Sequence, residues 1–239
     1  MLRVRPGPPT ASSRVTSPER VTLTLAHSEA AFLAGYLRVL AEWDMRACVR
    51  LVSRGKTLGV FGAPPTGCMS FIAIPLVIAP EPMDFAVIAG RFRDVLGDLS
   101  TPSVGPREVP LPESVSTPME LITLPPGNGW SLDEAATVEE LTPVVDAALA
   151  EFKRRIPLDE SVNSDQAQRV AQEIWSRPGL GQVPLRSLHT ARSLGMLNNP
   201  EATVQAATTT GWTRLATPSG QLFATDDSGN LGIRLALLQ

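Results

Sequence analysis

Two stretches of the sequence alternate short apolar runs with turn residues. The first covers residues 47–79 and the second covers residues 212–238. Each holds three apolar runs separated by turns of Gly, Pro, Ser or Asp, a pattern that is typical of β-hairpins. We therefore predict two related three-stranded units in a mainly antiparallel sheet, from an ancient duplication or in a pseudo-symmetric fold. The alternative is that any two β-meanders look alike once their turns match.

The last apolar run of the first stretch differs from its counterpart, because residues 71–78 are apolar at every position. Such a strand is expected to be covered on both faces. It also includes Pro75, which cannot donate a ladder hydrogen bond and so belongs at a sheet edge or a bulge. An apolar edge strand needs cover from a helix or from a partner. We therefore name Phe71, Pro75 and Val77 as candidate partner contacts. The counterpart at 231–238 alternates, which predicts a half-buried strand.

Apolar residues that recur every three or four positions predict helices beside the two stretches. One predicted helix start is a capping box formed by Ser131 and Glu134. A glycine-rich loop at 125–130 either shapes a binding site or lets Trp130 pack against the helix that follows. The predicted helices cover residues 29–44, 83–96, 131–141, 142–156, 164–176, 184–197 and 200–208, and short strands cover 21–26 and 119–124.

These elements predict an α+β fold in which helices pack on the sheet. Residues 20–97 form an N-terminal β-α-βββ-α unit, and residues 131–239 form a helical segment followed by the second three-stranded unit. Prolines concentrate between them at 98–130, which predicts an extended connection and a domain boundary. Residues 1–19 are basic and rich in proline, which predicts a disordered tail. The two units are either separate domains or parts of one.

Composition narrows the class of protein. The chain has 239 residues, 43% of them hydrophobic, and a net charge of −3 at pH 7. It can therefore bury a sizeable core, and it is not built to neutralise a phosphate backbone. Its two cysteines, Cys48 and Cys68, form no disulfide framework, which favours a reducing cytoplasm. No apolar run reaches the length of a membrane span. We expect a cytoplasmic protein whose partner is another protein or a second copy, with nucleic acid and membrane disfavoured.

The sequence lacks the usual motifs of catalysis and metal binding. Its two histidines, His27 and His189, are far apart, and neither Cys-x-x-Cys nor His-Glu-x-x-His occurs. Glycine loops of the G-x-x-x-x-G-K-[S/T] and G-x-G-x-x-G types are absent, and so is the G-x-S-x-G nucleophile elbow. We therefore predict no catalytic residue, no cofactor and no metal, and we favour a non-enzymatic role.

Three functions stay open at this point. The leading hypothesis is a non-enzymatic binding or adaptor protein that acts through protein–protein contact, with a homodimer through residues 71–78 as one form. The second is a winged-helix-like DNA-binding protein that uses residues 164–225, with DNA contacts from Arg186, Arg192 and Arg214. The third is an enzyme whose site is assembled from dispersed polar residues, which no motif in one sequence can reveal.

Overall fold

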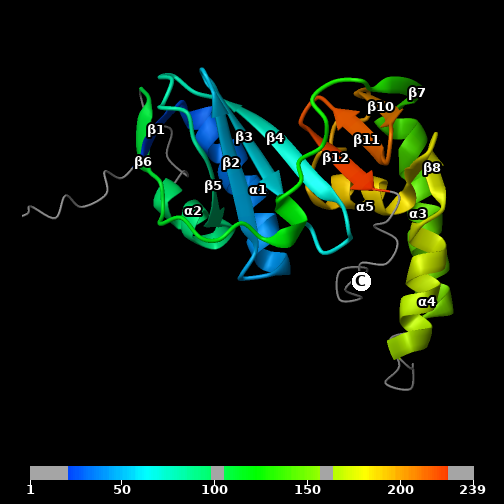
Figure 1. Ribbon diagram of the computed structural model, residues 1–239. Coiled ribbons are helices and arrows are strands. Elements are labelled where there is room, and N and C mark those ends of the chain that lie inside the picture. Colours follow the sequence, from blue (N-terminus) through cyan, green and yellow to red (C-terminus); the bar gives the residue numbers. More distant parts are fainter. Residues whose placement is uncertain (1–20, 98–104, 157–163, 226–239) are drawn as a thin grey trace, which may run out of the picture.

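The computed structural model describes residues 21–97, 105–156 and 164–225 (Figure 1). The predicted tail at 1–19 and the predicted strand at 231–238 lie outside these ranges. The described residues form a mixed α+β fold with a large antiparallel sheet, which confirms the predicted fold class. None of the helices in these ranges has the length and apolar character that a membrane span requires.

The described chain begins with a strand and ends with a three-stranded meander, and its helices lie between groups of strands. In order they are β1 (Thr22–Leu25), α1 (His27–Trp43), β2 (Cys48–Arg54), β3 (Thr57–Gly62), β4 (Met69–Pro75), β5 (Asp84–Ile88), α2 (Ala89–Leu96), β6 (Arg107–Pro110), the 3-10 turn η1 (Met119–Leu121), β7 (Ser131–Thr137), α3 (Val138–Arg155), α4 (Ser164–Trp175), β8 (Pro178–Leu180), β9 (Val183–Pro184), α5 (Leu185–Ser193), β10 (Thr203–Thr209), β11 (Trp212–Thr217) and β12 (Gly220–Thr225).

One eight-stranded sheet runs through the molecule in the order β5-β2-β3-β4-β12-β11-β10-β7. Its first four strands belong to the N-terminal unit (residues 21–121) and its last four to the C-terminal unit (residues 125–225). The units meet where β4 and β12 pair antiparallel, with Ser70 opposite Leu222. Figure 1 shows the two halves side by side, joined at this pair of strands.

The two units contain matching elements in a different chain order. Strands β10, β11 and β12 correspond to β2, β3 and β4, and the edge strand β7 corresponds to β5, since each edge strand pairs with the first strand of its meander. Helix α5 precedes β10 as α1 precedes β2, and the small β8-β9 sheet corresponds to the β1-β6 sheet. The pseudo-repeat is thus present, but its second meander lies at 203–225, one strand earlier than the sequence pattern placed it.

The main hydrophobic core lies on the helical side of the sheet and extends through both units. In β2, for example, Val49 and Leu51 are fully buried on this side, and Leu33 and Leu37 of α1 belong to the same buried cluster. A smaller cluster lies on the opposite side, which we call the outer face. Its members are Phe61, Ala63, Met69, Phe71, Leu121, Leu124, Trp130, Trp212 and Phe223.

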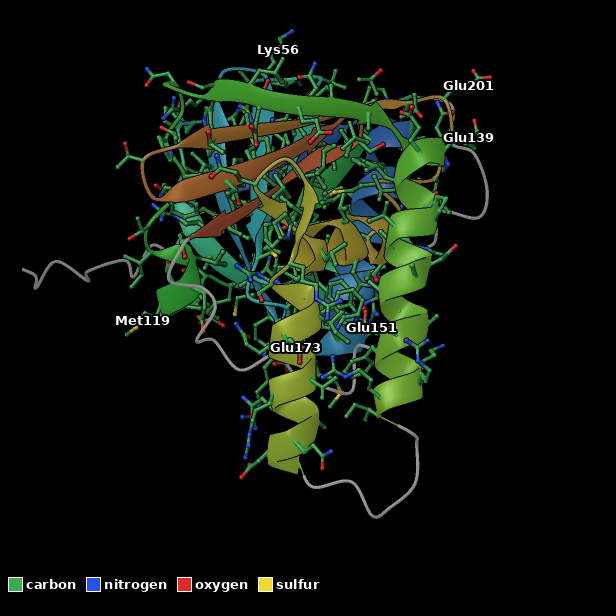
Figure 2. All side chains as sticks on the ribbon, turned by 90° about the vertical axis from the view of Figure 1, so that its right-hand side faces the viewer. Lys56, Met119, Glu139, Glu151, Glu173 and Glu201 are labelled. Atoms are coloured by element: carbon green, nitrogen blue, oxygen red, sulfur yellow. The ribbon has the colours of Figure 1, made fainter. Side chains whose placement is uncertain are left out.

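In the C-terminal unit, α3 and α4 pack against each other as a pair. Figure 2 shows α3 and α4 side by side and extending beyond the sheet, with Glu151 and Glu173 between them. Arg155 joins both helices, because its Nη2 lies 2.7 Å from Glu173 Oε2 and its Nη1 3.3 Å from Glu151 Oε1. Arg177 contacts the same two carboxylates, at 2.6 Å and 3.0 Å. An exposed ion-pair network thus holds the helix pair together.

Three predicted helical segments are strands or begin as strands. Residues 84–88 form β5, so the predicted helix at 83–96 begins only at Ala89. Residues 131–137 form β7, and the capping box belongs to the next residues, where Thr137 N donates to Glu140 Oε2 (2.7 Å) and Glu140 N to Thr137 Oγ1 (3.3 Å). Residues 203–209 form β10. The winged-helix order was therefore wrong, because its third helix is a strand in mid-sheet.

Strand β4 is not the edge strand that its proline predicted. It pairs with β3 on one side and with β12 on the other. Only one face is fully covered, since Ile72 and Ile74 are buried while Ala73 and Pro75 are exposed. Pro75 is tolerated because it is the last residue of the strand, where the ladder ends. The predicted burial on both faces and the predicted edge position are corrected accordingly. The predicted strand at 119–124 is likewise the 3-10 turn η1.

Candidate functional site

A cavity of about 680 Å³ lies where the two units meet, and we call it the junction cavity. Its walls come from five segments that are distant in sequence. These are the end of α1 with the start of β2 (residues 40–48), the β3–β4 turn (63–69), the connection at 118–123, the β10–β11 turn (211–212) and the end of β12 (223–225). Neither unit forms this cavity alone.

Apolar side chains from both units line the cavity where the sheets join. Met69 on β4 and Phe223 on β12 are cross-strand partners, and both are almost fully buried. Trp212, at the start of β11, lines the cavity beside them and is half-buried. Because β4 and β12 pair directly, their backbone ladder fixes the spacing of these side chains.

Three large exposed apolar side chains, Met45, Met119 and Ile122, flank lining residues of the cavity in the sequence, and we call them the rim. Met45, Met119 and Ile122 are 87%, 83% and 58% exposed. Each adjoins lining residues in the sequence, such as Asp44 or Glu120. Single exposed apolar residues are ordinary, but several of them next to the lining residues of one cavity are typical of an interaction surface. The cavity and its rim together form a surface that suits an apolar ligand.

Buried hydrogen bonds hold the β3–β4 turn against α5. Thr190 Oγ1 donates to Arg186 O (2.7 Å), so the hydroxyl of Thr66 is the donor in the 2.7 Å contact between the two threonines. Cys68 Sγ lies 3.4 Å from Ser187 Oγ. These contacts tie a wall from the N-terminal unit to a helix of the C-terminal unit, so the junction is fixed on its helical side as well.

On the outer face, Arg50 holds the connecting chain in place over the N-terminal unit. Its guanidinium makes a bidentate pair with Asp84, at 2.6 and 2.8 Å, and donates to the carbonyl oxygens of Leu121 (2.8 Å) and Ile122 (2.7 Å). The hydrogen bond from Arg50 lowers the pKa of the Asp84 carboxyl, and the same bond raises the pKa of Arg50. The rim residues around 119–123 are therefore held by a charged pair.

Trp130 covers the outer face of the C-terminal unit. Its Nε1 donates to Pro126 O (2.8 Å), and its ring lies 5.7 Å from the ring of Phe223. The Arg214 guanidinium lies 4.8 Å from the Trp130 ring centroid on its face. Burial lowers the pKa of Arg214. Of the two readings of the 125–130 loop, the packing of Trp130 on the following helix is wrong, because Trp130 packs on β11 and β12.

The structure does not bring the predicted DNA contacts together. Arg186 is buried on α5, and Arg192, on the same helix, pairs with Asp146. Arg214 lies on the outer face, on the other side of the sheet. The candidate partner contacts stay a prediction. Phe71 stacks on Phe61 with 4.8 Å between the ring centroids, Pro75 is exposed, and Val77 is 39% exposed.

Both thiols line the junction cavity, but they are not arranged for chemistry together. Cys48 is on β2 and Cys68 adjoins β4, and β3 lies between these strands. Two strand spacings are about 9–10 Å, which exceeds the reach of a disulfide. Burial, and then the nearby Asp44, raise the pKa of the Cys48 thiol and so disfavour its reactive thiolate. The described residues include no group of three or more His, Cys, Asp or Glu that could hold a metal ion.

Comparisons with known proteins match both units. Residues 18–115 match a family described as a domain of unknown function (DUF8010), and residues 125–229 match another domain of unknown function (DUF8185). No curated protein matches the chain.

Among solved structures, the chain is similar in fold to bacterial sliding clamps. The DNA polymerase III subunit beta of Pseudomonas aeruginosa has a TM-score of 0.55 and 14% identity, and the match covers 85% of this chain and 64% of that one. The beta subunit of Thermotoga maritima has a TM-score of 0.51 and 10% identity, with 86% and 64% covered. The Caulobacter crescentus beta sliding clamp, solved with polyethylene glycol in its putative beta-motif tethering region, has a TM-score of 0.51 and 14% identity, with the same coverage. This chain therefore spans 64% of the length of these clamps and shares their fold.

Proposed function

We propose that this protein is a non-enzymatic binding or adaptor protein and that its junction cavity takes a short apolar segment of a protein partner. The observation that carries the proposal is the cavity itself, whose apolar lining comes from both units and whose rim exposes Met45, Met119 and Ile122. Its volume, about 680 Å³, lies within the usual range of ligand sites. The expected location is the cytoplasm.

The likeness to sliding clamps supports this proposal at the level of fold. One of those clamps carries a polyethylene glycol chain in a region that its authors name a tethering region. A flexible chain molecule therefore binds to a protein of this fold, and a peptide segment is the protein equivalent. The clamps belong to DNA polymerases, so DNA is the alternative partner for this chain. The net charge of −3 favours the protein partner.

The test is selection of random displayed peptides on the full chain, followed by measurement of Kd by fluorescence anisotropy. We expect Met119→Glu to weaken the selected peptides at least about tenfold, because it places a charge on the apolar rim. Met119 is 83% exposed, so this variant should fold normally. The matched control is Ile78→Glu, which changes a 62% exposed residue just past Pro75, at the end of β4 opposite the cavity-lining Met69.

A second variant, Trp212→Ala, changes the lining of the cavity and should also weaken binding. Its unfolding midpoint must be measured in parallel, since Trp212 packs in the outer-face cluster. Selected peptides that bind both variants as tightly as the original chain would show that the junction cavity is not the binding site, and the proposal would then fail.

A further inference from the structure

Arg214 is a cation without a counter-ion among the described residues. It takes part in no hydrogen bond or ion pair there, and its Nε atom is buried without a hydrogen-bond partner. Its guanidinium rests only on the Trp130 ring, at 4.8 Å. Taking a charge out of water without pairing it is costly. Arg50, the comparable cation on the outer face of the other unit, instead has a bidentate carboxylate and two carbonyl oxygens.

The position of Arg214 relates it directly to the junction cavity. It lies two residues after Trp212 on β11, so the two side chains lie on the same face of the strand about 7 Å apart along it. Its cross-strand partner is Phe223. Both Trp212 and Phe223 line the cavity. Arg214 therefore lies just beyond the apolar lining, on the C-terminal side of the sheet.

Trp130 orients the guanidinium of Arg214 and leaves its terminal nitrogens accessible. Trp130 is fixed by its own hydrogen bond to Pro126, and it supports one flat face of the guanidinium. Arg214 as a whole stays partly exposed, and Nε alone among its nitrogens is buried without a partner. The terminal nitrogens are thus open to an incoming group. A planar guanidinium fork matches a carboxylate with two parallel hydrogen bonds.

We propose that Arg214 binds a carboxylate of the docked segment, so that the partner presents an apolar side chain to the cavity and an acidic side chain about two residues away. The spacing follows from the distance of about 7 Å between Trp212 and Arg214, which two residues of an extended peptide span. This inference rests on the proposed function. A phosphate backbone suits the site less well, because it brings further phosphates to a cavity wall in which two acids, Asp44 and Glu120, outnumber the one cation, Arg46.

The test uses the peptides selected on the full chain and their Asp→Asn or Glu→Gln versions. We expect the selected sequences to be enriched in an acid near an apolar residue, and the amide versions to bind about tenfold more weakly. Arg214→Met removes the charge and keeps most of the stem packing, so it should bind acid and amide versions equally. The matched control is Arg38→Met, which removes an exposed, helix-paired arginine and should preserve the tenfold preference.

The outcomes separate this inference from the proposed function. Peptides that depend on Met119 and Trp212 but carry no acid, or an acid preference that Arg214→Met leaves unchanged, would overturn the inference and leave the junction cavity as the binding site. Selected peptides whose Kd is unchanged by Met119→Glu and by Trp212→Ala would overturn the proposed function, and the inference would fail with it.

Discussion

The outer faces of the two units are built on the same strands but carry different chemistry. In the N-terminal unit, the row Ala86–Arg50–Phe61–Phe71 crosses the sheet through successive cross-strand pairs. In the C-terminal unit, the corresponding row is Leu132–Ala207–Arg214–Phe223. The two rows are equivalent because β4 and β12 pair symmetrically about Ser70 and Leu222.

Equivalent positions in the two rows carry different side chains. Arg214 stands where the N-terminal unit has Phe61, so an aromatic pair on one side corresponds to an arginine–aromatic pair on the other. Asp84 and Trp130 also correspond, because Asp84 lies two residues before Ala86 and Trp130 lies two residues before Leu132. The N-terminal unit therefore gives its arginine a carboxylate, whereas the C-terminal unit gives its arginine an aromatic ring. One face is electrostatically satisfied, and the other retains a cation that can pair with a ligand.

The largest expected effect comes from removing the ring that makes the C-terminal face different. Trp130→Ala should lower the free energy of unfolding by about 2 kcal/mol, less than for a fully buried tryptophan, because Trp130 is half-buried. It loses contact with both Phe223 and Arg214. Urea unfolding measures the change, and Trp130→Phe, which keeps a ring, should recover most of it. An unchanged unfolding midpoint in Trp130→Ala would mean that the ring does not stabilise this face.

The next effect tests the satisfied arginine. Asp84→Asn should destabilise the protein by about 1 kcal/mol at neutral pH, the upper end for a partly exposed pair, since the geometry is bidentate. Asp94→Asn is the control, because within the described ranges the Asp94 carboxylate pairs with its exposed neighbour Arg93 alone, so this substitution should have a smaller effect. Equal effects of the two variants would show that the Arg50–Asp84 pair has no special role.

The same pair predicts a pH dependence. Arg50 lowers the pKa of Asp84 in the folded state. The stabilisation is therefore fully present above the pKa of an unfolded aspartate and is lost as the pH falls through the lower folded-state pKa. The stability difference between the original chain and Asp84→Asn should shrink in acid. A difference that stays constant from neutral pH into acid would contradict the charged pair as its cause.

A third substitution makes the two faces alike. Arg214→Phe copies the Phe61–Phe71 pair onto the C-terminal unit and removes the cation that burial disfavours. We expect a gain of about 0.5 kcal/mol in the free energy of unfolding, the lower end for an aromatic pair. Thermal unfolding measures it, with Arg214→Met as the comparison without a ring. A loss of stability would show that the stacking of Arg214 on Trp130 outweighs its desolvation.

Local pattern was sufficient for some elements and misleading for others. The first meander and α1 follow from alternation and from helical spacing, and they lie close to the predicted positions. Residues 131–137 and 203–209 carry helix-like signals, yet they pair with each other as β7 and β10. Their strand conformation is set by a partner some seventy residues away, which a local pattern does not record.

The candidate site was harder to predict than the fold, because its residues converge from separate segments. Arg214 and the loop containing Trp130 were both noticed in the sequence, but for other roles. Nothing in the sequence places Trp130 under Arg214, because that contact depends on how the 125–130 loop crosses β11 and β12. The junction cavity likewise exists only once β4 has paired with β12.

The smallest expected effect concerns the ion pairs between α3 and α4 in the C-terminal unit. Hydrogen bonds from Arg155, and then from Arg177, lower the pKa of Glu173 to about 2. The network therefore stabilises α3 against α4 above the pKa of an unfolded glutamate and is lost as the pH falls toward about 2. Because these groups are exposed, Glu173→Gln should lower the unfolding midpoint less than Asp84→Asn does. High salt should bring the midpoint of Glu173→Gln close to that of the original chain, because salt screens the ion pairs. Thermal unfolding at low and high salt measures this, with Gln172→Ala as a control on the same helix. A loss of stability that does not depend on salt would mean that Glu173 acts through packing. The units would then differ in how their helices pack, as well as in the charges on their outer faces.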